Sequence, residues 1–396
     1  MKALAGLRVL DLTHMLSGPY ATLLLADMGA DVIKIEPPHG EATRVLLADD
    51  PAHSIDGMGA YFLFLGRNKQ SVTLNLKDPE ARPLLDALVA RADIVISNFS
   101  VGVADRLGLA HDRLAQVNPR IITCAITGFG ETGPHRHHAS FDMVAQATGG
   151  GMTLTGSGDV PLRAGLPIGD LGGGLMATIG ILAAVQARHT TGRGQHVDIS
   201  MQDVQVSLLS YMATMFGLSG RIPPAVGNGH FVHVPYNSYP TADGHIILAI
   251  ITDDSWLRLL AALDLPALDT PEHRRQPGRL QARERIDAAL AERLLARPRH
   301  DWLPLLRAAD IPCAPVQDLA EVLTDPQVLA RNMVVDVPHP GGRRTRQPGN
   351  PIKLSSTHED TFAAPPLLGQ DNAAVYRDLL GLDDQTILDL HARGIV

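Results

Sequence analysis

A single aspartate set among glycines is the residue with the clearest chemical use in this sequence. Asp170 stands in the run GLPIGDLGGG, residues 165–174, at the start of a long apolar segment. A carboxylate with an ordinary pKa near about 3.9 is ionised at neutral pH, so it attacks an activated carbonyl without a separate base. Neighbouring glycines would admit a bulky thioester, and backbone N–H groups at a helix start would stabilise the developing oxyanion. We therefore predict that Asp170 is a nucleophile; the simpler interpretation, a helix N-cap, stays open here.

Composition restricts the class of protein. The chain has 396 residues, 45% hydrophobic and 19% charged, which is typical of a globular protein with a large core. Its formal net charge is -8 without a dense Lys/Arg run, so nucleic-acid binding is not expected. Two distant cysteines, Cys124 and Cys313, argue against a disulfide framework or a metal site. With no signal-like stretch before Asp11, and with the apolar segment 172–187 shorter than the about 20 residues that span a bilayer, we expect a cytoplasmic protein.

Short apolar runs alternate with helical segments in the first 200 residues. The strand-like runs cover residues 7–12, 31–36, 71–76, 94–99 and 120–127. Apolar strands separated by helices predict a parallel sheet covered on both faces, so the fold class is α/β and Rossmann-like. The segment after the first strand-like run, THMLSGP (13–19), lacks the dinucleotide fingerprint, and the Walker A loop, the Gly-x-Ser-x-Gly elbow and the His-Glu-x-x-His motif are missing from the sequence, so the enzyme classes that use them lose support.

The character of the sequence changes near residue 221. A stretch rich in Gly, His, Asn, Tyr and Pro covers residues 226–244, and Arg/Ala/Leu-rich helices follow to about residue 310. We predict that residues 221–334 form a smaller α+β domain with its linkers. Residues 1–220 and 335–396 are then expected to form the large domain.

Further motifs combine with Asp170. They are LAGLRVLDLTH (4–14), GP (18–19), LADMGADVIKIE (25–36), RNKQS (67–71), GRGQHVD (192–198) and LLGQ (367–370). Together they closely resemble the family III coenzyme A transferases, the CaiB/BaiF group that includes formyl-CoA transferase and carnitine-CoA transferase. The resemblance runs from about residue 4 to residue 370, nearly the whole chain.

The resemblance implies a fold and a set of site residues. The family's catalytic aspartate falls on Asp170, and its two chains form an interlocked homodimer with the site between the large domain of one chain and the small domain of the other. Lys77 and Arg106 would suit the nucleotide phosphates as charge-assisted donors. His14 ends the first strand, where it either contacts the thioester region or caps a turn. The coenzyme-A-contacting positions are His14, Leu16, Ser17, Leu74, Lys77, Asn98, Phe99, Arg106, Ala139, Ser140, Phe141 and Asp142.

The resemblance also implies a reaction. CoA would move from an acyl-CoA to a carboxylic acid through an aspartyl-CoA thioester, with the CoA thioester as substrate and no permanently bound cofactor. The pattern looks most like members that use succinyl-CoA and a short dicarboxylate, whereas Pro37, where the family often has Arg, and the absence of a glycine-rich loop weaken the formate/oxalate reading. Candidate substrate contacts are Gly172, Gly173, His230 and Tyr236, although the last two also suit a polar interdomain loop.

Two alternatives remain. An α-methylacyl-CoA racemase would use Asp170 to transfer protons together with a histidine just before Asp142, but Phe141 stands at that position. The nearby His135, His137 and His138 come too early in the motif, so we expect them in a surface loop. A non-catalytic acyl-CoA-binding protein is the alternative from another class.

Overall fold

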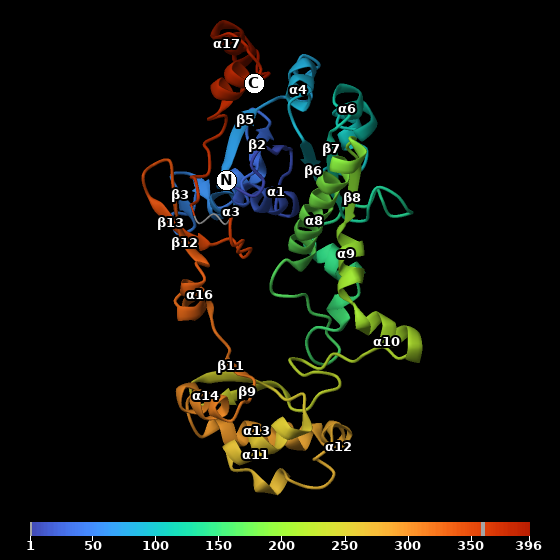
Figure 1. The fold of residues 1–396 in the computed structure, drawn as a ribbon, viewed down its shortest axis with the longest axis vertical. Helices are drawn as coiled ribbons and strands as arrows, with labels where there is room; N and C mark the ends of the chain where they lie inside the picture. Colours follow the sequence, from blue (N-terminus) through green and yellow to red (C-terminus); the bar gives the residue numbers. More distant parts are fainter. Residues whose placement is uncertain (1, 358–360) are drawn as a thin grey trace. The chain divides into compact units, whose positions relative to one another are not determined.

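Two compact units make up the chain. The computed structural model describes residues 2–357 and 361–396 (Figure 1). The large unit comprises Met1–Gly150, Ala164–Ser210 and Pro326–Val396, and the small unit comprises Gly151–Arg163 and Tyr211–Asp325. This division cuts the chain about ten residues before each of the two boundaries expected from the sequence. The assignment of the units as separate domains stays a prediction.

A six-stranded sheet is the frame of the large unit. Its strand order is β5-β2-β1-β6-β7-β8, and each neighbouring pair is parallel. The predicted α/β class with a parallel sheet is therefore confirmed. The strands are β1 (Arg8–Asp11), β2 (Asp31–Glu36), β5 (Lys69–Thr73), β6 (Ile94–Ser97), β7 (Ile122–Thr127) and β8 (His196–Ser200).

Both faces of this sheet are buried. Alternate side chains of each strand point to opposite faces, and each face packs against its own set of helices. Val9 and Val32 pack with residues of α1 and α8, whereas Leu10 and Ile33 pack with residues of α4, α6 and the C-terminal segment. The helices of the unit are α1 (Ser17–Asp27), α2 (Ala42–Val45), α3 (Ala60–Leu65), α4 (Ala81–Val89), α5 (Val103–Arg106), α6 (His111–Val117), α7 (Asp142–Thr148), α8 (Ile168–Thr191), α9 (Met201–Leu208), α16 (Pro326–Ala330) and α17 (Asp384–Ala392), with a π-helix, η3, at Ala374–Leu379.

Two hairpins complete the large unit. β3 (Ser54–Ile55) pairs with β4 (Met58–Gly59), and β12 (Val334–Pro338) pairs with β13 (Arg344–Pro348), both antiparallel. The C-terminal strands close against the early part of the chain, since Gln347 Nε2 donates a hydrogen bond to the carbonyl of Leu63 at 2.9 Å. The large unit is thus built from both ends of the sequence.

The small unit has its own sheet and core. Its antiparallel sheet has the order β11-β10-β9. The two tryptophans of this aromatic-poor chain, Trp256 and Trp302, are fully buried in its core. The elements are η1 (Gly151–Thr153), α10 (Tyr211–Ser219), β9 (Tyr236–Thr241), β10 (Gly244–Ala249), α11 (Asp253–Leu263), η2 (Pro266–Leu268), α12 (Gln276–Gln281), α13 (Arg283–Leu295), α14 (Arg299–Ala308), β11 (Cys313–Pro315) and α15 (Leu319–Val322).

The helix that begins beside Asp170 is longer than its apolar core suggests. α8 has 24 residues and is, by length and composition, apolar enough to cross a membrane. The expectation that this segment is too short was wrong, because the helical backbone continues past both ends of residues 172–187. Half of its apolar window is buried, and the helix packs against α1, β7, β8 and α9. The core helix of an α/β protein meets the same criterion, so length and composition alone are weak evidence for a membrane span.

Candidate functional site

The N-terminus of α8 is capped by a second aspartate. Oδ1 of Asp142 accepts hydrogen bonds from the backbone N–H groups of Gly169 at 2.8 Å and Asp170 at 3.3 Å. Gln146 Nε2 donates to the other carboxylate oxygen of Asp142 at 2.8 Å. The N-cap position belongs to Pro167, without a side-chain cap, so Asp170 itself is not the cap. The N–H groups of Gly169 and Asp170 are therefore engaged by Asp142, and stabilisation of an oxyanion by backbone N–H groups at this helix start stays a prediction.

The environment of Asp170 makes its carboxylate more basic than usual. Burial raises the pKa of Asp170 to about 6, and the charge of Asp142 adds to the rise. An ordinary pKa was expected from the sequence, because neither the depth of the side chain nor its acidic neighbour is visible there. A carboxylate with this pKa is still mostly ionised at pH 7, and a more basic carboxylate is the stronger nucleophile.

Glycines allow α8 to lie close to its neighbours. A Cβ at Gly174 would lie 2.6 Å from the carbonyl oxygen of Ser17 in α1, a contact that side chains do not tolerate. Cβ atoms at Gly172 and Gly173 would meet Val204 and Met201 of α9 at 3.0 and 3.2 Å. Both glycines are buried against α9 and β7, which explains their presence by packing. Their contact with substrate stays a prediction.

A cavity of about 280 Å³, the Asp170 cavity, lies in the large unit. Most of the residues predicted for the reacting end of the substrate line it: His14, Ser17, Asn98, Phe99, Ala139, Ser140, Phe141 and Asp170. The histidine-rich loop is exposed, as expected, and two of its residues, Arg136 and His138, also line this cavity. Sequence reasoning missed both residues because their position beside the cavity depends on the course of the loop between β7 and α7, which local sequence does not reveal.

One amide holds the turn that follows β1. Asn98 Oδ1 accepts a hydrogen bond from the N–H of His14 at 2.9 Å, and Asn98 Nδ2 donates to the His14 carbonyl at 2.7 Å. The next residue, Met15, has φ of 63°, a left-handed conformation that is uncommon outside glycine. The His14 and Phe99 rings lie 5.6 Å apart between centroids. Asn98 therefore positions His14 at the carboxyl end of the sheet.

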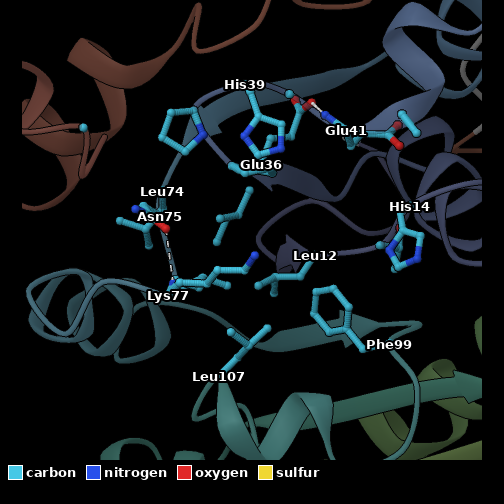
Figure 2. A pocket seen from close by; sticks show the side chains of 18 residues that line it. Leu12, His14, Glu36, His39, Glu41, Leu74, Asn75, Lys77, Phe99 and Leu107 are labelled. Carbon is cyan, nitrogen blue, oxygen red and sulfur yellow. Dashed lines mark hydrogen bonds between the residues drawn. The ribbon is translucent and has the colours of Figure 1, made fainter.

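A larger cavity of about 800 Å³, the Lys77 cavity, adjoins the first. Figure 2 shows Lys77, Leu74 and Asn75 on one side of it, with His39 and Glu41 from the segment after β2 across from them. His14 and Phe99 line both this cavity and the Asp170 cavity. Lys77, Phe99 and Arg106 line a third hollow of about 710 Å³. Leu16, the remaining predicted contact, is half-buried at the N-cap of α1.

The candidate residues of the small unit form a ring cluster. His230 lies 5.2 Å from Tyr236 and 4.8 Å from His233 between ring centroids. Its Nδ1 accepts hydrogen bonds from the N–H groups of Val232 and His233, each at 3.1 Å. Since Nδ1 accepts, the remaining ring nitrogen of His230 carries the proton in the neutral form. The structure brings His230 and Tyr236 together, and their role in substrate binding stays a prediction.

A buried ionic network under the site was not anticipated. Lys69 Nζ donates to Asp11 Oδ2 at 3.0 Å, and both side chains are almost completely buried. Hydroxyls of Thr13 and Thr22 donate to the same carboxylate at 2.5 and 2.7 Å. Burial raises the pKa of Asp11, but the charges of Lys69 and Lys34 outweigh it and hold the pKa well below the usual range. The network ties β5 to the turn that carries His14.

Comparison with known proteins identifies the family. The family model described as CoA-transferase family III matches residues 4–372. The chain belongs to CoA-transferase family III. The chain is 38% identical to formyl-CoA:oxalate CoA-transferase of Streptomyces avermitilis, over all of both chains. It is 39% identical to succinyl-CoA:mesaconate CoA-transferase of Haloarcula marismortui, over 98% of each.

A human protein and a solved structure support the same family assignment. Succinyl-CoA:glutarate CoA-transferase of Homo sapiens is 33% identical over all of this chain and 90% of its own length. The crystal structure of a CAIB/BAIF family protein from Brucella suis superposes with a TM-score of 0.86 at 35% identity, covering 96% of this chain and 99% of that one. This family III CoA-transferase is therefore an enzyme that uses a CoA thioester and a carboxylic acid as substrates.

The loss of transferase activity at acidic pH should follow the protonation of Asp170. We expect kcat/KM to fall about tenfold per pH unit below about pH 6, because protonation removes the nucleophilic carboxylate. Asp142→Asn keeps an oxygen for the two N–H groups but removes the neighbouring charge. Since a nearby negative charge disfavours ionisation, its removal should move this loss of activity to lower pH.

Steady-state kinetics from pH 4.5 to about 8 would measure this, with circular dichroism at each pH to confirm folding. Asp384→Asn, in the first turn of α17, is the matched control and should lose activity at the same pH as wild type. An unchanged pH dependence in Asp142→Asn would show that the two carboxylates do not interact during turnover.

Proposed function

We propose that this enzyme transfers CoA from an acyl-CoA to a short dicarboxylic acid through an aspartyl-CoA thioester on Asp170. Succinyl-CoA is the proposed donor. The observation that carries the proposal is the continuity of two cavities. The Asp170 cavity and the Lys77 cavity share His14 and Phe99 as lining residues. An extended CoA thioester would lie across these two rings, with its carbonyl near Asp170 and its nucleotide near Lys77.

Cations support the assignment of the nucleotide end. Lys77 and Arg106 are exposed and line one hollow with Phe99. Phosphate oxygens accept strong charge-assisted hydrogen bonds from such side chains. Leu74 is buried in the wall of the Lys77 cavity and offers an apolar surface for the adenine ring. The reacting end is far smaller, which suits a short acyl group.

The reaction divides into two displacements at Asp170. Its carboxylate attacks the donor thioester carbonyl, the C–S bond breaks, and a mixed anhydride and CoA thiolate form. The thiolate then attacks the aspartyl carbonyl, so the donor acid leaves and an aspartyl-CoA thioester remains. The acceptor carboxylate attacks this thioester and releases the thiolate, which takes the acyl group from the second anhydride and restores Asp170. Each step exchanges one acyl bond for another and needs no net proton transfer.

Water would hydrolyse both intermediates, so the site must be enclosed during turnover. Apolar side chains stand exposed along α8 and α9, namely Leu175, Ile179, Val206 and Leu208. Large exposed apolar side chains gathered on two neighbouring helices are typical of protein interfaces. A second copy of the chain covering this surface, in a cytoplasmic homodimer, is part of the proposal.

The names of the relatives support a dicarboxylic acceptor. Oxalate, mesaconate and glutarate, the acceptors named for the relatives described above, all carry two carboxylates. Identities of 38% and 39% to the oxalate and mesaconate enzymes do not separate these two acceptors. A comparison of kcat/KM for each acid identifies the acceptor.

A substrate panel tests the proposal. Succinyl-CoA, formyl-CoA and acetyl-CoA are each mixed with dicarboxylic and monocarboxylic acids, and new CoA esters are detected by mass. We expect succinyl-CoA with one short dicarboxylate to give the highest kcat/KM. Transfer among monocarboxylates alone would overturn the substrate class. Exchange of the α-proton of a 2-methylacyl-CoA in deuterated water, without CoA transfer, would establish the racemase instead.

A further inference from the structure

One permanently charged cation lines the Asp170 cavity among the residues that the structure describes. It is Arg136, in the loop between β7 and α7. Its Nε donates a hydrogen bond to Nε2 of His137 at 3.0 Å. The hydrogen bonds and ion pairs of the described chain leave its two terminal amino groups without a protein partner. The guanidinium is thus an exposed group that borders the cavity, with one hydrogen bond to the adjacent residue and two unpaired amino groups.

Several other polar residues of this cavity already have partners. The Asn98 amide binds both backbone groups of His14, as described above. Thr127 Oγ1 accepts the N–H of Gly130 at 2.9 Å. His138 lies 4.8 Å from the His135 ring and 5.9 Å from the Phe129 ring between centroids, in an edge contact with the latter. Among the described lining residues, Arg136 is therefore the one that brings a permanent positive charge to an anion entering this cavity.

A dicarboxylic acid presents a problem of charge. One carboxylate reacts at Asp170, and the other remains ionised inside a cavity of about 280 Å³ that already holds the Asp170 carboxylate. Like charges at such short range disfavour binding unless a cation compensates. A guanidinium binds a carboxylate through two parallel N–H···O hydrogen bonds, which gives geometric selection as well as charge.

We propose that Arg136 binds the unreacted carboxylate of the dicarboxylic acid and so selects dicarboxylic over monocarboxylic substrates. This inference rests on the proposed function, because it assumes CoA transfer at Asp170. It assigns Arg136 to substrate recognition rather than to the bond-making steps. The substrate class then follows from the cavity of this chain as well as from the names of its relatives.

The test compares glutarate with its monoamide, which has nearly the same shape but lacks the second charge. We expect Arg136→Gln to lower kcat/KM for glutarate about tenfold or more, mainly through KM, because a charged hydrogen-bond partner is lost. Activity with the monoamide should stay within about twofold, since a neutral amide gains little from a cation. Arg136→Lys should give an intermediate loss, because an ammonium keeps the charge without the planar fork.

Arg193→Gln, at the opposite end of α8, is the matched control and should leave both substrates unaffected. Equal losses for glutarate and the monoamide would assign Arg136 a structural role and overturn the inference, as would no change with either. In both cases the proposed function stands if wild type transfers CoA and Asp170→Ala does not. Absence of any CoA transfer to a dicarboxylate by wild type would overturn the proposed function and this inference together.

Discussion

Asp170→Ala and Asp170→Asn should each lower CoA transfer by at least about 10⁴-fold, since removal of a covalent nucleophile leaves only binding and orientation. The loss should fall on kcat, because the residues of the Lys77 cavity still bind the CoA thioester. Asn preserves the size of the side chain, so it separates loss of the carboxylate from loss of packing. The measurement is turnover of the best substrate pair from the panel.

Two controls sharpen this result. Asp384→Asn changes an exposed aspartate in the first turn of a helix of the same unit and should retain full activity. The dissociation constant of succinyl-CoA for Asp170→Asn, measured by calorimetry, should remain within about threefold of the wild-type value. The Asp170 carboxylate forms a bond during the reaction and contributes little to binding of the unreacted substrate. Retained turnover in both Asp170 variants would exclude a nucleophilic role for this residue.

Lys69→Met should be the most destabilising of the single substitutions considered, by about 3–5 kcal/mol, because it leaves the buried Asp11 carboxylate without its closest cation. Asp11 and Lys69 are both almost fully buried, and their atoms lie 3.0 Å apart. The turn that carries His14 is hydrogen-bonded to the same carboxylate through Thr13. We therefore expect a higher KM for the CoA thioester in whatever fraction of the variant folds.

The double variant Asp11→Leu/Lys69→Met is the matched control for charge. It removes both ions, so it should recover part of the stability lost in the single variant. Urea denaturation followed by circular dichroism measures all three proteins, with Arg193→Met as the exposed control. A single variant as stable as wild type would mean that the pair contributes nothing to the free energy of unfolding.

The parallel sheet was predictable because its strands are continuous apolar runs separated by helices. Four of these five predicted strands correspond to β1, β2, β6 and β7, and their predicted ends lie within two residues of the observed ends. The predicted strand 71–76 starts two residues too late, since β5 begins at Lys69, a charged residue that precedes the predicted run. Lys69 enters the strand because its ammonium reaches the buried Asp11, a tertiary contact that local sequence does not reveal.

The site was predictable only where a motif marks it. Asp170 and its helix start could be identified from the glycine run, and the coenzyme-A-contacting positions came from family resemblance. The Asp142 cap and the raised pKa of Asp170 depend on two carboxylates 28 positions apart in sequence meeting in space. Arg136 enters the cavity through the course of a loop, which carries no periodic signal.

The most direct test of the account is mass spectrometry of the enzyme after incubation with succinyl-CoA in the absence of an acceptor. We predict that the peptide containing Asp170 gains the mass of CoA in a thioester, that hydroxylamine removes it, and that added dicarboxylate discharges it as a new CoA ester. Asp170→Asn should show no adduct. A competent enzyme that turns over without a covalent adduct on Asp170, or with one on another residue, would contradict the account.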